Sequence, residues 1–393
     1  MNKLKNKKKN IKLLPYIFAL NTTWFWLGVW LPFYLTIMDY AGVGFIGSTV
    51  FLIGFLLEIP TGAITDIIGK KRALLISFLA YAVGNFVMAY STEYWHILLS
   101  VLILMFWTSF YSGTSDAILY DSLAEQKQEE SFNKYKAKAE RLGLIFMALA
   151  SIIGGFLYAE DESLPFLFTG AAGIIGFLLI LFFIEEPKID SYEFTLKNYL
   201  KQNFEGFKHL FSRKLGIYTL VAILVIAAFG YIFDTLADPA LLVENNFSEQ
   251  ALGIIFSFLP LVGSVGLSIY EKFYVSINKR MQIIIFIFFL TAFLSVIKLQ
   301  ALIIILVIYR SIFQSIYNVH VSDVLNKNFS SKYRATALSS FTMLSKLPYI
   351  ATSLILGIVI EQYSAGILVL GLSIIFGVIY SFVALRQGRG LVN

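Results

Sequence analysis

Long apolar segments recur from one end of this chain to the other, separated by short polar connections. A helix needs about 20 such residues to cross a bilayer. The segments are continuously apolar, whereas the strands of a membrane barrel alternate between apolar and polar positions. The pattern predicts an all-α integral membrane protein with twelve transmembrane helices. The predicted spans are 13–38, 44–65, 73–91, 95–122, 140–159, 165–184, 215–242, 249–270, 281–297, 299–325, 335–360 and 363–385.

Composition supports this class and excludes several others. Of the 393 residues, 58% are apolar and only 14% are charged, where a soluble protein has about 25% charged residues. This excludes a soluble enzyme and a disordered chain. The absence of cysteine and the scattering of three histidines exclude thiolate metal sites and predict no metal. No nucleotide-binding loop is present, so we expect no ATP hydrolysis and no cofactor beyond a proton gradient.

The basic residues assign a side of the membrane to each connection. Of the 31 Lys and Arg residues, 28 fall in the two tails, in alternate loops or, for Arg141, at the adjoining end of a span, and the positive-inside rule places this side in the cytoplasm. Acidic residues occupy the opposite loops. Both termini are therefore predicted to be cytoplasmic, with tails at 1–12 and 386–393. The first apolar run is too long for a signal peptide, so we expect it to remain attached.

One long connection, 185–214, divides the spans into two bundles of six helices, 13–184 and 215–385. Leu200, Phe204, Phe207 and Phe211 recur at helical spacing between lysines and arginines. This is typical of an amphipathic helix that lies on the inner membrane surface and joins the two bundles. A binding site for a soluble partner is the less favoured alternative.

The two halves also resemble each other in sequence. A shift of 202 residues places the end of the fourth span on the tenth without gaps, with Asp121 on Asp323. The same shift places Gly155 on Gly357. Such an internal repeat is typical of secondary transporters.

A motif follows the second span: Gly62-x-x-x-Asp66-x-x-Gly69-Lys70-Lys71-Arg72. Gly62 permits close helix approach and Gly69 permits a tight turn with positive φ. The chain resembles the major facilitator superfamily in this motif, in its position and in its side of the membrane. The resemblance implies two six-helix bundles that work by alternating access.

Two further runs look like those of bacterial drug-efflux members of this family, which exchange drugs for protons. They are Glu58-Ile-Pro-Thr-Gly62 and the nine residues that begin at Ser115. The resemblance implies that Asp66 latches the second helix to the start of the eleventh, through Lys332 or Arg334. The chain departs from the family pattern at Ile67, at Ser109, and at Ala150 and Ser151, which leaves the antiporter subtype open.

Charges inside the predicted spans are costly in a bilayer and usually functional. We expect Glu58 and Asp116 to carry protons, because a carboxylate in a low dielectric titrates closer to neutral pH. Arg310 and Lys346 lie near the midplane, where they would neutralise these carboxylates or hold an anionic substrate group. The alternative is that these charges form structural pairs between helices.

The remaining candidates are polar or aromatic residues near the same depth and charges at helix ends. Asp234 and Asp238 would form an outer gate or a polar rim. The predicted substrate-binding residues are Asn21, Trp24, Trp107, Tyr111, Arg310, Gln314 and Lys346. The predicted gating residues are Gly62, Asp66, Gly69, Lys70, Lys71, Asp121, Asp234, Asp323 and Arg334.

Together these features predict a proton-coupled transporter that exports lipophilic small molecules by rocker-switch alternating access. The alternatives are proton-coupled uptake of an anionic small molecule and flipping of a lipid or glycolipid. A membrane enzyme would need clustered acids, histidines or metal ligands at one interface, and the sequence has none. We expect a monomer in a bacterial plasma membrane that contacts lipids and a small-molecule substrate and binds no nucleic acid.

Overall fold

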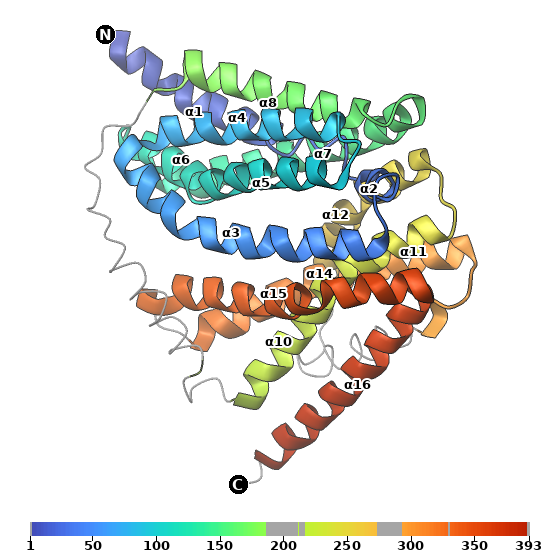
Figure 1. Cartoon of the computed structure of the whole chain (residues 1–393). Helices are drawn as coiled ribbons and strands as arrows, with labels where there is room; N and C mark the ends of the chain where they lie inside the picture. The colour runs from blue at the N-terminus through green and yellow to red at the C-terminus, as the bar shows by residue number, and fades with distance from the viewer. Residues whose placement is uncertain (1, 186–210, 212–216, 273–292, 329–330, 391–393) are drawn as a thin grey trace. The chain divides into compact units, whose positions relative to one another are not determined.

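The computed structural model describes residues 2–185, 211, 217–272, 293–328 and 331–390, all of whose regular structure is helical (Figure 1). Most of the predicted connection 185–214 and most of the predicted span 281–297 lie outside these residues. The helices are α1 (Asn2–Leu20), α2 (Trp30–Leu35), α3 (Tyr40–Ile68), α4 (Lys70–Ala89), α5 (Tyr94–Tyr111), α6 (Thr114–Ala124), α7 (Phe132–Glu160), α8 (Leu164–Phe183), α10 (Ile217–Ile232), α11 (Asp238–Glu244), α12 (Glu249–Lys272), α14 (Gln300–Asn328), α15 (Ser331–Gln362) and α16 (Ala365–Gly390).

Within that part of the chain, eight helical segments are long and apolar enough to cross a membrane. Shorter apolar helical segments accompany them in α1, α3 and α16, at Asn10–Leu20, Tyr40–Gly54 and Ala365–Ile379. The all-α membrane architecture expected from the sequence is therefore confirmed.

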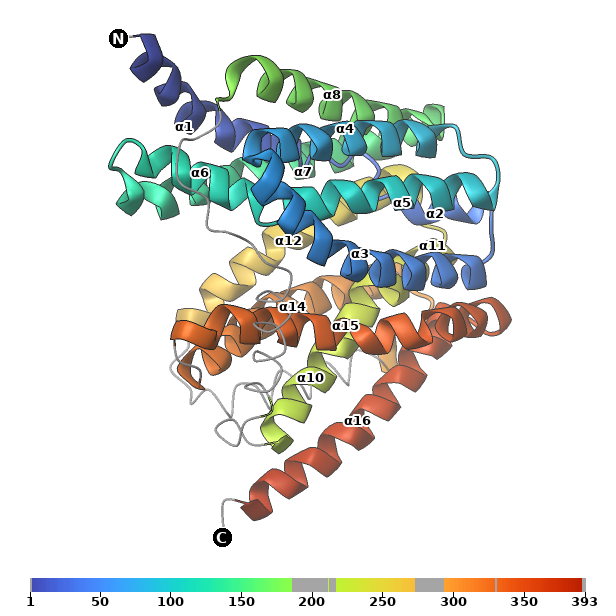
Figure 2. The same ribbon diagram turned by 60° about the vertical axis from the view of Figure 1, so that its left-hand side comes forward.

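The chain folds into two compact units (Figure 2). Unit 1 comprises the described residues within Met1–Met38, Thr49–Leu196 and Ser248–Phe258. Unit 2 comprises those within Asp39–Ser48, Lys197–Phe247 and Leu259–Asn393. The first turns of α3 thus belong to unit 2 and those of α12 to unit 1.

In unit 1, α4 packs between α5 and α8, and α1 packs on α7. Gly173 and Gly176 of α8 bring its backbone against the rings of Tyr81 and Phe78. Leu14 and Ile17 of α1 are fully buried in the same apolar core as Phe78. In unit 2, α10 packs against α14, α15 and α16.

The first predicted span is not one continuous helix. Helix α1 ends at Leu20, and turns lead to α2, which begins at Trp30. Thr22 and Thr23 donate their hydroxyls to the Ala19 carbonyl at 2.9 and 3.2 Å. Such local side-chain bonds offer the backbone an alternative to the helix. Non-helical backbone at membrane depth is tolerated only where protein or a cavity surrounds it.

The fourth predicted span is interrupted as well. Helix α5 ends at Tyr111 and α6 begins at Thr114. Between them Gly113 has a φ of 71°, and the Thr114 amide donates to the Ser112 carbonyl at 2.7 Å. This three-residue turn requires a positive φ, which glycine adopts without steric cost.

Contacts made by the two halves support the internal repeat. The Ser151 hydroxyl of α7 donates to the Gly253 carbonyl of α12 at 2.9 Å. Ser353 of α15, which lies 202 residues further along the chain, donates to the Gly44 carbonyl of α3 at 2.7 Å. Gly155 and Gly357 each lie one turn beyond the corresponding serine. Gly155 faces backbone atoms of α12, and Gly357 faces backbone atoms of α3. Corresponding residues of the repeat therefore make corresponding contacts.

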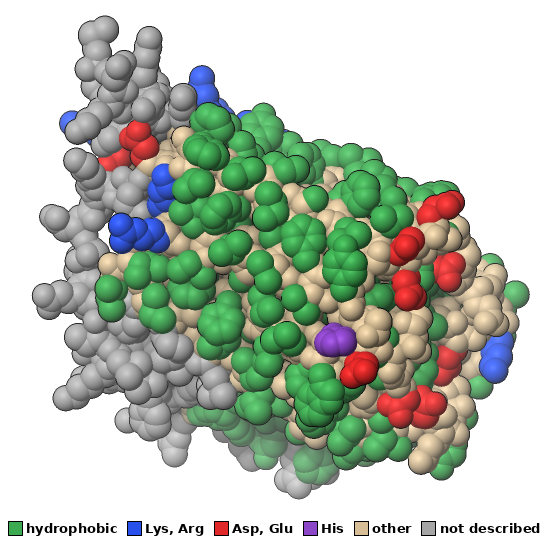
Figure 3. All heavy atoms as spheres, turned by 45° about the horizontal axis from the view of Figure 1, so that its top comes forward, with side chains coloured by type: hydrophobic (Ala, Val, Ile, Leu, Met, Phe, Trp, Pro, Cys, Tyr) green, Lys and Arg blue, Asp and Glu red, His purple; other side chains and the backbone are tan. Residues whose placement is uncertain are grey.

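Large apolar side chains remain exposed along the helices, as a lipid-facing surface requires. Examples in unit 1 are Leu79, Ile175 and Phe182, which are 45%, 51% and 70% exposed. Figure 3 shows this hydrophobic surface with acidic side chains gathered at one end of it. Exposed acids lie in the predicted outer connections of unit 1, for instance Glu93 and Asp161.

The packing of α8 on α4 gives a test of the fold. A methyl group added at Gly176 would overlap the Phe78 ring, whereas one added at Gly371 of α16 would meet no atom within 4 Å. We expect Gly176→Ala to lower the free energy of unfolding by about 1–3 kcal/mol through overpacking. Gly371→Ala should leave it unchanged or raise it slightly, because alanine favours the helix. Thermal unfolding of the purified protein in detergent measures both, and equal shifts would contradict the α4–α8 packing.

Candidate functional site

A cavity of about 510 Å³ lies within unit 1 between α1, the interrupted helix α5–α6 and α7. Its apolar lining includes Phe18, Tyr111, Leu119, Leu144 and Met147. The Phe18 and Tyr111 rings meet edge to face with centroids 5.9 Å apart. This volume falls in the range of about 300–1,000 Å³ that small-molecule sites occupy.

Three charged side chains line the same cavity. Asp116 of α6 forms an ion pair with Lys136 of α7. Their side chains are 48% and 38% exposed, so both charges remain accessible from the cavity. Glu140 follows Lys136 by one helical turn, is exposed, and has no ion-pair partner among the residues described. The three charges give the lining a net charge of about −1 when all are ionised.

Both helix interruptions border this cavity. Ser112 and Ser115 contribute hydroxyls from either side of the Gly113 turn. Thr22, in the break after α1, also lines the cavity and donates its hydroxyl to the Gly143 carbonyl of α7 at 3.1 Å. Polar groups therefore reach an otherwise apolar cavity where the helices are interrupted.

Of the residues predicted from the sequence, Asp116 and Tyr111 lie together in this cavity. Lys136 and Glu140 were missed as site residues, because the predicted span began at residue 140 and left Lys136 in a cytoplasmic loop. In the structure α7 begins earlier, at Phe132. The sequence does contain a sign of this longer helix. Lys136 and Glu140 are four residues apart, a spacing that places them on the same face of a helix.

Three predicted substrate-binding residues, Asn21, Trp24 and Trp107, contact one another instead of lining this cavity. Asn21 is buried and accepts a hydrogen bond from the Trp107 indole at 2.6 Å. The backbone carbonyl of Asn21 accepts another hydrogen bond from the Trp24 indole at 2.8 Å. The Tyr81 ring packs on Trp107 with centroids 4.5 Å apart. Substrate binding by Asn21, Trp24 and Trp107 stays a prediction.

The loop motif after α3 is anchored within unit 1. Gly69 has a φ of 92°, as a tight turn requires. Lys70 forms an ion pair with Asp121 of α6, and Lys71 donates to the Leu181 carbonyl of α8 at 3.1 Å. In unit 2, Asp323 pairs with Lys327 at 2.6 Å on the surface of α14. The surroundings of Glu58, Gly62, Asp66 and Arg334 lie outside the described part, so their roles stay predictions.

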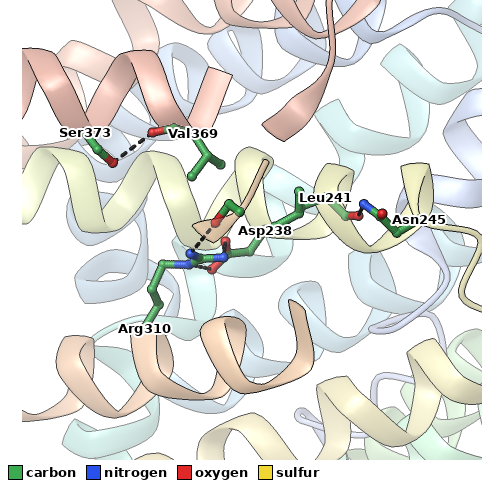
Figure 4. Close-up of polar contacts among 7 residues, drawn as sticks. Asp238, Leu241, Asn245, Arg310, Val369 and Ser373 are labelled. Atoms are coloured by element: carbon green, nitrogen blue, oxygen red, sulfur yellow. Dashed lines mark hydrogen bonds and ion pairs between the residues drawn. The ribbon is translucent and has the colours of Figure 1, made fainter. Parts of the chain in front are cut away.

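A buried ion pair lies in unit 2 (Figure 4). Arg310 of α14 and Asp238 of α11 are 3% and 9% exposed and are joined by contacts of 2.6 and 3.0 Å. Arg310 also donates to the Ser295 hydroxyl at 3.2 Å, and its guanidinium lies over the Phe233 ring at 5.5 Å. A buried charge is tolerated when it is paired and hydrogen-bonded in this way. Asp238 follows directly on a π-helical turn, Phe233–Ala237, an irregularity that is frequent at functional sites.

The other predicted residues of unit 2 are not members of this ion pair. Asp234 is exposed, and the ammonium of Lys346 lies 5.7 Å from the centre of the Tyr231 ring. Gln314 packs against the backbone at Gly230, and its amide donates to Asn318 at 3.4 Å. Their parts in gating and substrate binding stay predictions.

Comparisons with known proteins identify the family. Residues 13–353 match the model of the Major Facilitator Superfamily. The chain is 23% identical over 385 residues to an MFS-type transporter, YxaM, of Bacillus subtilis, covering 91% of this chain and 89% of that protein. It is 24% identical over 244 residues to the quinolone resistance protein NorA of Staphylococcus aureus, covering 60% of this chain and 59% of NorA.

Solved structures share the fold. The nucleoside transporter NupG superimposes with a TM-score of 0.78 at 18% identity, covering 96% of this chain and 98% of NupG. A bacterial homologue of the human lysosomal transporter Spinster gives a TM-score of 0.71 at 15% identity, covering 97% and 96% of the two chains.

The turn between α5 and α6 gives a prediction. Because a Cβ at Gly113 would meet no atom within 4 Å, a substitution there is opposed by backbone strain alone. We expect Gly113→Ala to cost about 1–3 kcal/mol of unfolding free energy. Gly113→Asn should cost less, because asparagine tolerates positive φ better than alanine. Thermal unfolding of the two variants measures the difference, and equal costs would show that the turn does not require this backbone conformation.

The buried ion pair gives another. Arg310→Met leaves the Asp238 carboxylate buried without its partner and should destabilise the protein by about 3–5 kcal/mol. The double variant Arg310→Met with Asp238→Leu removes both charges and should recover most of that loss. A double-mutant cycle on unfolding free energy tests the pair. Additive losses in the double variant would mean that the two side chains do not depend on each other.

Proposed function

This chain belongs to the Major Facilitator Superfamily, and we propose that it is a secondary active transporter that exports lipophilic small molecules in exchange for protons. The observation that carries the proposal is the cavity of unit 1, which combines an apolar and aromatic lining with a titratable ion pair. A lipophilic substrate gains free energy when it leaves water for such a lining.

The geometry of Asp116 supports its role in proton coupling. Its carboxylate borders the cavity and neutralises Lys136. Protonation would remove the negative charge and free the lysine, so the charge within the cavity would depend on the proton gradient. A ligand or proton that favours one of two conformations shifts the equilibrium between them. The ion pair therefore offers a physical link between proton binding and the rocker-switch movement.

Two observations support export over uptake of an anion. NorA, to which this chain is similar, is a quinolone resistance protein. Arg310, one of the two cations predicted to hold an anion, already binds the Asp238 carboxylate. An anion would have to displace that buried partner. We propose that the protein works in a bacterial plasma membrane, because the similar proteins YxaM and NorA come from Bacillus subtilis and Staphylococcus aureus.

Transport by everted membrane vesicles tests this function. In vesicles acidified inside, a transported lipophile should release protons and accumulate, and Asp116→Asn should reduce the coupled proton flux at least about tenfold. Lys134→Gln, an exposed substitution outside the cavity, serves as the control and should leave transport unchanged.

The alternatives give different results in the same vesicles. Proton movement evoked only by a small anion, with no response to lipophiles, would establish uptake and contradict export. Movement of a fluorescent phospholipid between leaflets, with no response to small lipophiles, would establish lipid flipping.

A further inference from the structure

We propose that the ammonium of Lys136 is a tethered stand-in for a cationic substrate: it occupies the carboxylate site of the unit 1 cavity until a lipophilic cation displaces it. This inference rests on the proposed function and names the substrate class of the same cavity. The ion pair of Lys136 with Asp116 inside an apolar lining is the observation behind it.

The position of Lys136 fits a mobile occupant of the site. Its side chain is 38% exposed and pairs with Asp116, and its ammonium lies 6.0 Å from the centre of the Phe132 ring. Lysine is a compact charge on a flexible stem of four carbons. The ammonium can therefore leave the carboxylate for solvent without any backbone movement.

The charge balance of the lining favours a cation in its place. Asp116 and Glu140 contribute two carboxylates against the one ammonium of Lys136. When Lys136 swings out and a monovalent cation enters, the cation faces both carboxylates and is attracted more strongly than by a neutral cavity. An anion entering the same space would meet both carboxylates and be repelled.

The aromatic lining completes the site for a cation with an apolar body. Phe18 and Tyr111 present their rings to the cavity from α1 and α5. The faces of such rings attract cations that lack hydrogen-bond donors. Leu119, Leu144 and Met147 bury the remaining apolar surface of the ligand. The lining therefore suits a lipophilic monovalent cation better than a strongly hydrated one such as an alkylammonium head group.

Two ions of equal size and opposite charge test the proposal. Tetraphenylphosphonium and tetraphenylborate binding to the purified full-length protein is measured by calorimetry in detergent. Lys136→Gln should bind tetraphenylphosphonium about fivefold more tightly than the wild type, because the internal competitor is gone. Asp116→Asn should bind it at least about fivefold more weakly. The exposed control Lys134→Gln should bind it as the wild type does.

The outcomes separate this proposal from the proposed function. If Lys136→Gln weakens tetraphenylphosphonium binding as Asp116→Asn does, or if both ions respond alike to each substitution, the stand-in role is wrong. Wild-type vesicles that still export an uncharged lipophile would then leave the exporter function intact. If vesicles export no lipophile of any charge, the proposed function itself fails, whatever the binding results.

Discussion

The low dielectric of the bilayer interior is the constraint on which this structure depends. A charge placed there has no water to solvate it, so it must find an opposite charge or hydrogen-bonding groups within the protein. The pair of Arg310 and Asp238 meets this demand with an ion pair between two buried side chains. The pair of Asp116 and Lys136 satisfies it while remaining open to a cavity. The first arrangement stabilises the fold, and the second leaves charges that a ligand or a proton can reach.

Interrupted helices supply the polar groups of the cavity under the same constraint. A continuous helix bonds its own backbone and presents only side chains to its surroundings. The break after Leu20 and the turn at Gly113 bring Thr22, Ser112 and Ser115 into an apolar space. Close approach at glycines, as between Gly176 and Phe78, fixes the surrounding helices without polar contacts. The cavity is thus built from local exceptions to helical regularity within a closely packed unit.

The all-helical membrane architecture could be predicted from hydropathy, because long apolar runs obey a simple physical rule. The sequence repeat aligns Gly155 with Gly357, and in the structure each of these glycines packs against the backbone of a neighbouring helix. The helix breaks could not be predicted, since the polar residues after Leu20 are too few to interrupt an apolar run in a hydropathy pattern. Lys136 was missed because the residues around it are charged, so the hydropathy pattern begins the span only at residue 140. In the structure the helix already begins at Phe132. The partner of Arg310 also depended on tertiary packing that spacing along the chain does not reveal.

We propose that the cavity between α1, α6 and α7 holds the transported molecule. Photolabelling of the purified protein with a diazirine derivative of tetraphenylphosphonium, followed by mapping of the labelled peptides, tests it directly. We expect label in the segments around Tyr111 and Met147, with both signals suppressed by an excess of unlabelled tetraphenylphosphonium. Competable label confined to unit 2, with none on these segments, would contradict the claim.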